Sequence, residues 1–153
     1  MMIWTTRLTR KKAVLAVLLL GAVMALAILL TAKHDAADLT PVPLDSNEAR
    51  VEYLQSMGWE VNPEPLETLQ FLLPKQLEEP YLSYNELQDS QGFDLSTCCG
   101  KQVARYTYAV TNYPDRPDGV QLNLYVCEEK PVAGDVFCAG KDGFQRTLVY
   151  PGE

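Results

Sequence analysis

Twenty consecutive residues without a charged side chain, Ala13 to Ala32, constrain this chain more than any other feature. A helix rises about 1.5 Å per residue, so a run of this length spans about 30 Å, the thickness of the hydrocarbon core of a bilayer. Leu, Ala, Val and Ile dominate the run, and no face of it is polar enough to lie flat at a membrane interface. The sequence therefore predicts a transmembrane helix over residues 13–32.

The charges that flank this run predict its orientation. Residues 33–38 after it carry a nearly balanced mixture of charges, whereas four basic residues stand before it: Arg7, Arg10, Lys11 and Lys12. The positive-inside rule then predicts a cytoplasmic tail over residues 1–12 and places the chain from Lys33 onward across the membrane. A cleaved signal peptide is the alternative, although the apolar core of such a peptide is usually about 7–15 residues long. Both interpretations export the rest of the chain, to the membrane surface or as a secreted protein.

The exported part is acidic. Four of the 13 basic residues precede the apolar run, which leaves nine basic against 20 acidic residues in residues 33–153, a net charge of −11. Because like charges repel at contact distance, such a domain is a poor partner for nucleic acid or anionic lipid. We expect no nucleic-acid partner and a soluble, monomeric domain; a basic protein or peptide partner is the alternative.

All four cysteines, Cys98, Cys99, Cys127 and Cys138, lie in the exported part. An even count in an oxidising compartment predicts two disulfides. Adjacent cysteines rarely bond to each other, so Cys98 and Cys99 are each expected to pair with one of the later two. Free thiols are an alternative. Redox or zinc chemistry is a further one, but the chain has no C-x-x-C motif and a single histidine near the apolar run. We expect no cofactor and no metal.

The pattern of the remaining chain predicts one α+β domain over residues 45–153, after a stalk over residues 33–44 that contains two prolines. The predicted elements are a helix from Asp45 or Ser46 to a stop at Gly58, a strand over 66–73, a helix over 79–91, and strands over 102–112, 120–126 and 132–137, with an optional edge strand over 145–150. This order predicts an antiparallel sheet of about four strands with two helices packed on one face and the other face partly wet.

The domain shows no catalytic constellation. It has no histidine in its predicted core to activate a Ser, Thr or Cys nucleophile, and no phosphate-binding glycine loop. A carboxylate pair such as Glu60 with Asp94 could support acid–base chemistry, but 20 acidic residues make chance pairs certain. We therefore expect a protein that is not an enzyme, with a secreted enzyme as the weaker alternative.

Several short blocks of the domain form a specific combination. They are Gly58-Trp59-Glu60-Val61, Pro63-Glu64-Pro65, Tyr84-Asn85 with Gln88, Gly92-Phe93-Asp94-Leu95, Gly100-Lys101, Arg105-Tyr106-Thr107-Tyr108, Asn112-Tyr113-Pro114, Gly134-Asp135-Val136 and Asp142-Gly143-Phe144. In this order, over about Arg50 to Phe144, the chain resembles a bacterial family of domains of unknown function, the DUF4830 type, which follow an N-terminal membrane segment. The family has no established activity, so the resemblance implies architecture and exposure rather than chemistry.

The chain departs from the family pattern at its cysteines. Cys98 and Cys99 stand where family members commonly have an aromatic and a basic residue. Members also place a Cys directly after Gly-Asp-Val, whereas here Phe137 comes before Cys138. A shift of one residue in a strand moves a side chain to the other face. The resemblance therefore favours a disulfide arrangement peculiar to this protein.

The function that fits these features best is a membrane-anchored binding or interaction module. The resemblance suggests an interaction surface formed by Trp59, Phe93, Asp94, Tyr113, Asp135 and Phe144. For each of these residues a purely structural role is the alternative, because apolar residues after helix-ending glycines usually pack back on the helix and aspartates often hold turns. A structural subunit of an envelope complex is the alternative function.

Overall fold

The computed structural model describes residues 42–152. The predicted cytoplasmic tail, transmembrane helix and most of the stalk lie outside these residues. Within the described residues, no helix is both long and apolar enough to cross a membrane.

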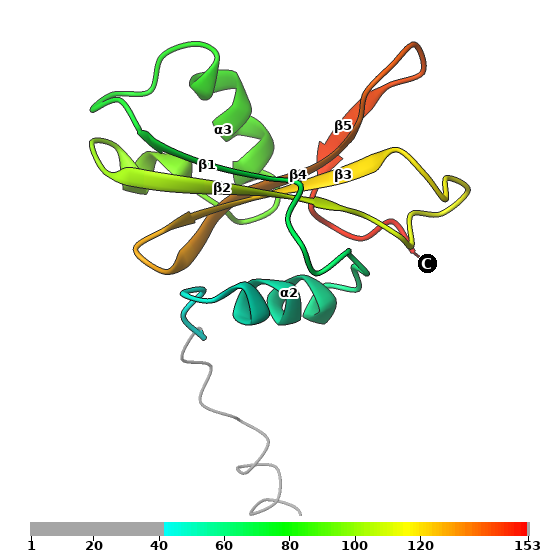
Figure 1. The fold of residues 1–153 in the computed structure, drawn as a ribbon. Helices are drawn as coiled ribbons and strands as arrows, with labels where there is room; N and C mark the ends of the chain where they lie inside the picture. Colours follow the sequence, from blue (N-terminus) through cyan, green and yellow to red (C-terminus); the bar gives the residue numbers. More distant parts are fainter. Residues whose placement is uncertain (1–41, 153) are drawn as a thin grey trace, which may run out of the picture. The chain divides into compact units, whose positions relative to one another are not determined.

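The described residues form an antiparallel sheet and two α-helices, which confirms the α+β class (Figure 1). The elements are α2 (Asn47–Ser56), β1 (Glu67–Leu72), α3 (Tyr81–Asp89), the short 3-10 helix η1 (Leu95–Cys98), β2 (Gln102–Ala109), β3 (Val120–Cys127), β4 (Lys130–Cys138) and β5 (Phe144–Thr147). The sheet has five strands in chain order, β1-β2-β3-β4-β5, and not about four. The fifth is β5, which the sequence pattern predicts only as an optional strand over 145–150. It begins one residue earlier and ends three residues earlier than that.

Local signals in the sequence account for the ends of both helices. The side chain of Ser46 caps α2 by accepting a hydrogen bond from the Ala49 amide at 3.1 Å. Gly58 and Gly92 follow α2 and α3 with φ values of 93° and 85°, the left-handed conformation that favours glycine. The sequence predicts both glycine stops, Gly58 and Gly92, whereas α3 runs from Tyr81 to Asp89 and is two residues shorter at each end than the expected helix over 79–91.

The central hairpins also follow from the sequence. Alternation in β2 and β3 pairs Tyr106 with Leu124 in an antiparallel register, as predicted. The turn between β3 and β4 consists of Glu128 and Glu129, both with positive φ, which suits a two-residue hairpin. The short extended piece predicted around Val61 forms a single bridge with Val110.

The prediction that both helices pack on one face of the sheet is wrong. In Figure 1, α2 lies below the sheet and α3 above it. Leu54 of α2 packs with Leu122 and Leu124 of β3, while Tyr84 of α3 packs with Tyr125, which belongs to the opposite face of the same strand. The second face carries many polar side chains, and the sequence therefore predicts that solvent covers part of it. In the structure α3 covers it instead.

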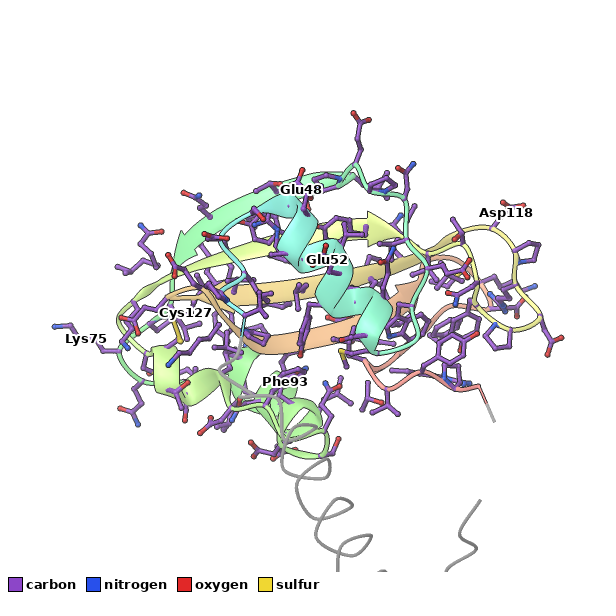
Figure 2. The ribbon with its side chains drawn as sticks, turned by 90° about the horizontal axis from the view of Figure 1, so that it is seen from below. Glu48, Glu52, Lys75, Phe93, Asp118 and Cys127 are labelled. Carbon is purple, nitrogen blue, oxygen red and sulfur yellow. A yellow bond between two sulfur atoms is a disulfide. The ribbon has the colours of Figure 1, made fainter. Side chains whose placement is uncertain are left out.

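The face covered by α2 holds the larger of the two hydrophobic clusters. Trp59 is buried there, and its indole Nε1 donates to the carbonyl of Leu148 at 2.7 Å. Arg50 is also buried, with its guanidinium 3.7 Å from the centre of the Tyr106 ring. Glu48 and Glu52 point away from the sheet on the outer side of α2, as Figure 2 shows, so only the inner side of this helix contributes to the core.

The smaller cluster lies under α3 and η1 and includes a disulfide between Cys98 and Cys127. At the edge of the sheet, the alternation of Leu69, Phe71 and Leu73 in the sequence predicts that β1 buries one face. Leu73 is buried just beyond the strand, but Leu69 is 42% exposed. The outer position of β1 explains this exposure, because only β2 lies beside it.

Candidate ligand-binding cleft

A cleft of about 520 Å³ lies between α3 and the face of the sheet that this helix covers. Strand alternation directs Arg105, Asn123, Tyr125 and Asp135 to this face. The full lining is Pro80, Tyr81, Tyr84, Arg105, Asn123, Tyr125, Asp135, Phe137, Phe144 and Gln145. The volume and the mixture of aromatic and polar groups are typical of a site for a small molecule.

A buried carboxyl group, that of Asp135, organises the polar part of the cleft. The side chain is 1% exposed and accepts hydrogen bonds from the Tyr84 hydroxyl at 2.6 Å and from the Gln145 amide at 3.2 Å. Asn123 on the paired strand donates to both carboxyl oxygens, at 3.3 and 3.4 Å. Burial raises the pKa of Asp135 above its ordinary value, and these three donors oppose the rise.

Two tyrosines beside Asp135 are held in their neutral form. Burial, together with the nearby carboxyl of Asp135, raises the pKa of Tyr84 far above its ordinary value. Burial likewise raises the pKa of Tyr125. Both hydroxyls therefore keep their protons at physiological pH and can act as hydrogen-bond donors, not as bases.

Arg105 supplies the cationic group of the cleft. It lies directly opposite Tyr125 in the β2–β3 pair and forms an ion pair with Glu67 through Nη2. Its Nε is buried and finds no hydrogen-bond partner among residues 42–152. A buried donor without an acceptor costs free energy, so a ligand that brings an acceptor to this Nε–H would remove that cost.

The chemistry of the lining suits recognition. It contains no Ser, Thr, Cys or His that could act as a nucleophile beside a base. It does contain a cation, neutral donors and several aromatic rings, which together can bind a polar group and an apolar body.

The six residues of the predicted interaction surface do not form one patch. Trp59, Tyr113 and Phe144 come together in a stack, with Trp59 and Tyr113 centroids 6.3 Å apart and Tyr113 and Phe144 centroids 5.1 Å apart. Arg116 and Arg146 lie 5.5 and 5.2 Å from the centre of the Phe144 ring. Trp59 is buried in this stack, so its main contacts are with the core.

Phe93 and Asp94 lie elsewhere and have local structural contacts. Asp94 caps η1 by accepting from the Ser96 amide at 2.9 Å. Hydrogen bonding to Ser96, through its side chain first and its amide second, lowers the pKa of the Asp94 carboxyl below the ordinary value. The Phe93 amide donates to the Gln88 carbonyl after the end of α3, and its ring packs on the larger core cluster. Asp135 and Phe144 are the two predicted residues that line the cleft.

The cysteines form one disulfide instead of the two expected. Cys98 pairs with Cys127, and Cys99 and Cys138 are free. Cys138 is opposite Val120 in the β3–β4 register, seven residues along β3 from Cys127 and hence about 23 Å away. Cys99 adjoins the bonded Cys98 at the Cys127 end, so Cys138 is far beyond the reach of a second disulfide.

Sequence reasoning missed the polar residues that accompany Asp135 in the cleft. Arg105, Asn123 and Tyr125 were assigned to a half-wet face of the sheet, and Tyr84 to the inner side of a helix. The signal that was available is the position of Asn123 within an apolar strand. A buried amide of this kind needs partners, which here are Thr107 and Asp135.

Fold and cleft together define a small α+β domain whose antiparallel sheet lies between two helices and carries a polar, aromatic-lined site under one of them. A family model described as "Domain of unknown function (DUF4830)" matches residues 53–132, and the chain belongs to this family. The matched region includes Tyr84, Arg105 and Tyr125 and ends before Asp135. No curated protein and no solved structure matches the chain.

Proposed function

We propose that this chain is a single-pass membrane protein whose acidic domain faces away from the cytoplasm and binds a ligand in the cleft under α3. The apolar run over residues 13–32, with basic residues before it, supports the anchor and its orientation. The observation that carries the binding role is the buried Asp135, bonded to three side chains beside an aromatic-lined cleft. Polar groups so buried and so completely paired hold the walls of a cleft in place.

Two reporters fused after Glu153 test the topology. Alkaline phosphatase should be active and green fluorescent protein should be dark, because the first needs export and the second is fluorescent only when it folds in the cytoplasm. The intact mass of the membrane-extracted chain then separates a retained anchor from a cleaved signal peptide. A fluorescent cytoplasmic fusion with an inactive phosphatase would contradict the proposal.

Fragment probes test the binding role. The full chain, labelled with nitrogen-15 in detergent micelles, is titrated with a set of small aromatic compounds, and the amide signals that move are mapped on the structure. The proposal expects them to cluster on α3 and on the cleft-lining face of β2–β5. Signals that move instead around the groove on the opposite face, near Leu44, Gln70 and Glu129, would place the site elsewhere and overturn this assignment.

An assembly role is the second candidate, and β1 is the observation that favours it. Its outer edge is unpaired within the described residues, and Leu66, Leu69 and Leu72 are 55%, 42% and 65% exposed. Exposed edge strands of this kind can add a strand from another chain. If the role is assembly, the detergent-extracted protein should carry a stoichiometric protein partner, and Leu69→Lys should release it.

A further inference from the structure

The polar groups of the cleft divide into those already bonded to each other and those still able to bind. Asp135, Asn123 and the hydroxyl of Tyr84 belong to the first set, since each takes part in the hydrogen-bond network described above. Gln145 joins them through its amide. A ligand would therefore find the carboxyl oxygens of Asp135 and the amide oxygen of Asn123 already occupied as acceptors.

Among the described residues, the charged group of the cleft that still has free donors is Arg105. The guanidinium of Arg105 makes one hydrogen bond within residues 42–152, to Glu67, and has four further N–H groups. Its side chain is 27% exposed at the cleft, so it can be reached from solvent. The hydroxyl of Tyr125 lies beside it and is neutral because burial raises its pKa. Donors that lack acceptors select a ligand that carries acceptors.

The remainder of the lining is aromatic. Tyr81 and Phe137 line the cleft, and the centroids of the Tyr84 and Tyr125 rings are 5.5 Å apart. Flat apolar walls favour a ring or a chain of carbon atoms next to the acceptor group. We infer that the ligand of this cleft is a carboxylate attached to an apolar or aromatic body, with the carboxylate held by Arg105 and Tyr125. This inference rests on the proposed binding function.

The acidic character of the domain does not exclude an anionic ligand. Repulsion by distant acidic side chains is screened over about 8 Å at physiological salt, whereas contact with a half-buried guanidinium is not. Two acidic groups beside the guanidinium site are already paired, since Glu67 bonds to Arg105 and the carboxyl of Asp135 accepts from its three donors. Arginine also has the planar geometry that binds a carboxylate through two parallel hydrogen bonds.

Three probes that share one body test the inference. The full chain in detergent micelles, with only its six arginines labelled, is titrated with 3-phenylpropionate, 3-phenylpropanol and 3-phenylpropylamine, and the arginine Nε–H signals are followed. We expect the Arg105 signal to move with the carboxylate, which should bind at least about tenfold more tightly than the alcohol, as a charge-assisted hydrogen bond predicts. The amine should bind most weakly.

Variants assign the effect to one residue. Arg105→Gln should weaken 3-phenylpropionate at least about tenfold, whereas Lys101→Gln removes the same charge away from the cleft and should change affinity less than about twofold. Glu67→Gln removes the carboxylate that competes for the guanidinium and should tighten binding. Because Glu67 is mostly exposed, this variant is informative even if Arg105→Gln folds poorly.

The outcomes separate the inference from the function on which it rests. Equal binding of the three probes in the cleft, or preference for the amine, would overturn the carboxylate assignment and leave the binding function standing. Signals that move only outside the cleft would overturn both. A peptide ending in a free phenylalanine carboxylate, compared with its amidated form and with 3-phenylpropionate, then distinguishes a peptide C-terminus from a free organic acid as the source of the carboxylate.

Discussion

The hydroxyl of Tyr84 lies 2.6 Å from Oδ1 of Asp135 and joins α3 to the middle of β4 across 51 residues of the chain. Other contacts between the same helix and strand surround it. The side chain of Gln88 accepts from the Gly134 amide at 2.8 Å, and that of Gln91, two residues after the end of α3, donates to the Gly134 carbonyl at 2.8 Å. These polar contacts hold the helix on the sheet. The cleft lies beside them, and aromatic side chains form much of its lining.

Removing the Tyr84 hydroxyl should weaken this attachment. In Tyr84→Phe the carboxyl of Asp135 stays buried with one donor fewer, so we expect a loss of about 1–3 kcal/mol in the free energy of unfolding, measured by urea denaturation of the full chain in detergent. Tyr81→Phe is the matched control on the same helix, since no hydrogen bond of that hydroxyl is present in the described residues. Equal losses in the two variants would argue against a specific role for the Tyr84–Asp135 bond.

Asp135 should make stability depend on pH in an unusual direction. Its pKa is raised in the folded protein, so the folded state holds the proton more tightly than the unfolded state, whose value is close to 3.8. The stability that this group contributes is fully present below that value and is lost as the pH rises through the folded-state pKa. The difference in unfolding free energy between the wild type and Asp135→Asn should therefore fall as pH increases from about 3.5 to 7.

Asp94 provides the control of opposite sign for this measurement. Its pKa is lowered by hydrogen bonding to the side chain and the amide of Ser96, so its contribution is present above the ordinary value and is lost as the pH falls. The difference between the wild type and Asp94→Asn should rise over the same pH range. Parallel trends for the two variants would contradict the assignment of a raised pKa to Asp135.

Patterns that involve neighbouring residues in the chain could be predicted from sequence. The alternation of β2 and β3 and the glycines after both helices are confirmed because each depends on local geometry. The covered second face could not be predicted in this way. Its polar side chains resemble a solvated surface in sequence, yet Thr107 donates to Asn123 at 2.7 Å in a buried contact. Whether the polar side chains on this face contact solvent or bond to each other depends on α3, which comes from a distant part of the chain.

The cysteines also show that local sequence does not predict contacts between distant parts of the chain. Composition and compartment predicted that disulfides form, and Cys98–Cys127 is present. The number of disulfides depends on register, because β4 runs antiparallel to β3 and carries Cys138 to the opposite end of the hairpin. The place of Arg105 in the cleft likewise depends on strand pairing, which sets it opposite Tyr125 and could not be predicted from local sequence.

Alkylation without reductant should add two labels to the folded chain. Cys99 and Cys138 are free and partly exposed, whereas Cys98 and Cys127 are bonded, and intact-mass measurement with peptide mapping identifies the labelled positions. Cys98→Ser opens a link across 29 residues and should cost about 3–4 kcal/mol in unfolding free energy. Cys99→Ser keeps the disulfide and should cost much less. An unlabelled protein would show that Cys99 and Cys138 are oxidised in another way.

Gly134 lies where β4 meets α3 and the segment after β5. A methyl group at this position would lie 2.7 Å from Cδ2 of Leu148 and 3.1 Å from the carbonyl oxygen of Asn123. The Leu148 side chain can move by changing rotamer, but the Asn123 carbonyl belongs to the paired strand and cannot. Gly134→Ala should therefore destabilise the domain by about 1–3 kcal/mol, the usual cost of overpacking, when measured by urea denaturation.

A double-mutant cycle with Leu148→Val separates the two contacts of Gly134. If the clash with Leu148 dominates, the shorter side chain should recover part of the loss, and the two substitutions should show a coupling of at least about 0.5 kcal/mol. Additive losses would instead assign the whole cost to the Asn123 carbonyl. Because Asn123 also donates to Asp135, that second result would predict a change in the cleft as well, visible as a shifted Arg105 Nε–H signal in Gly134→Ala.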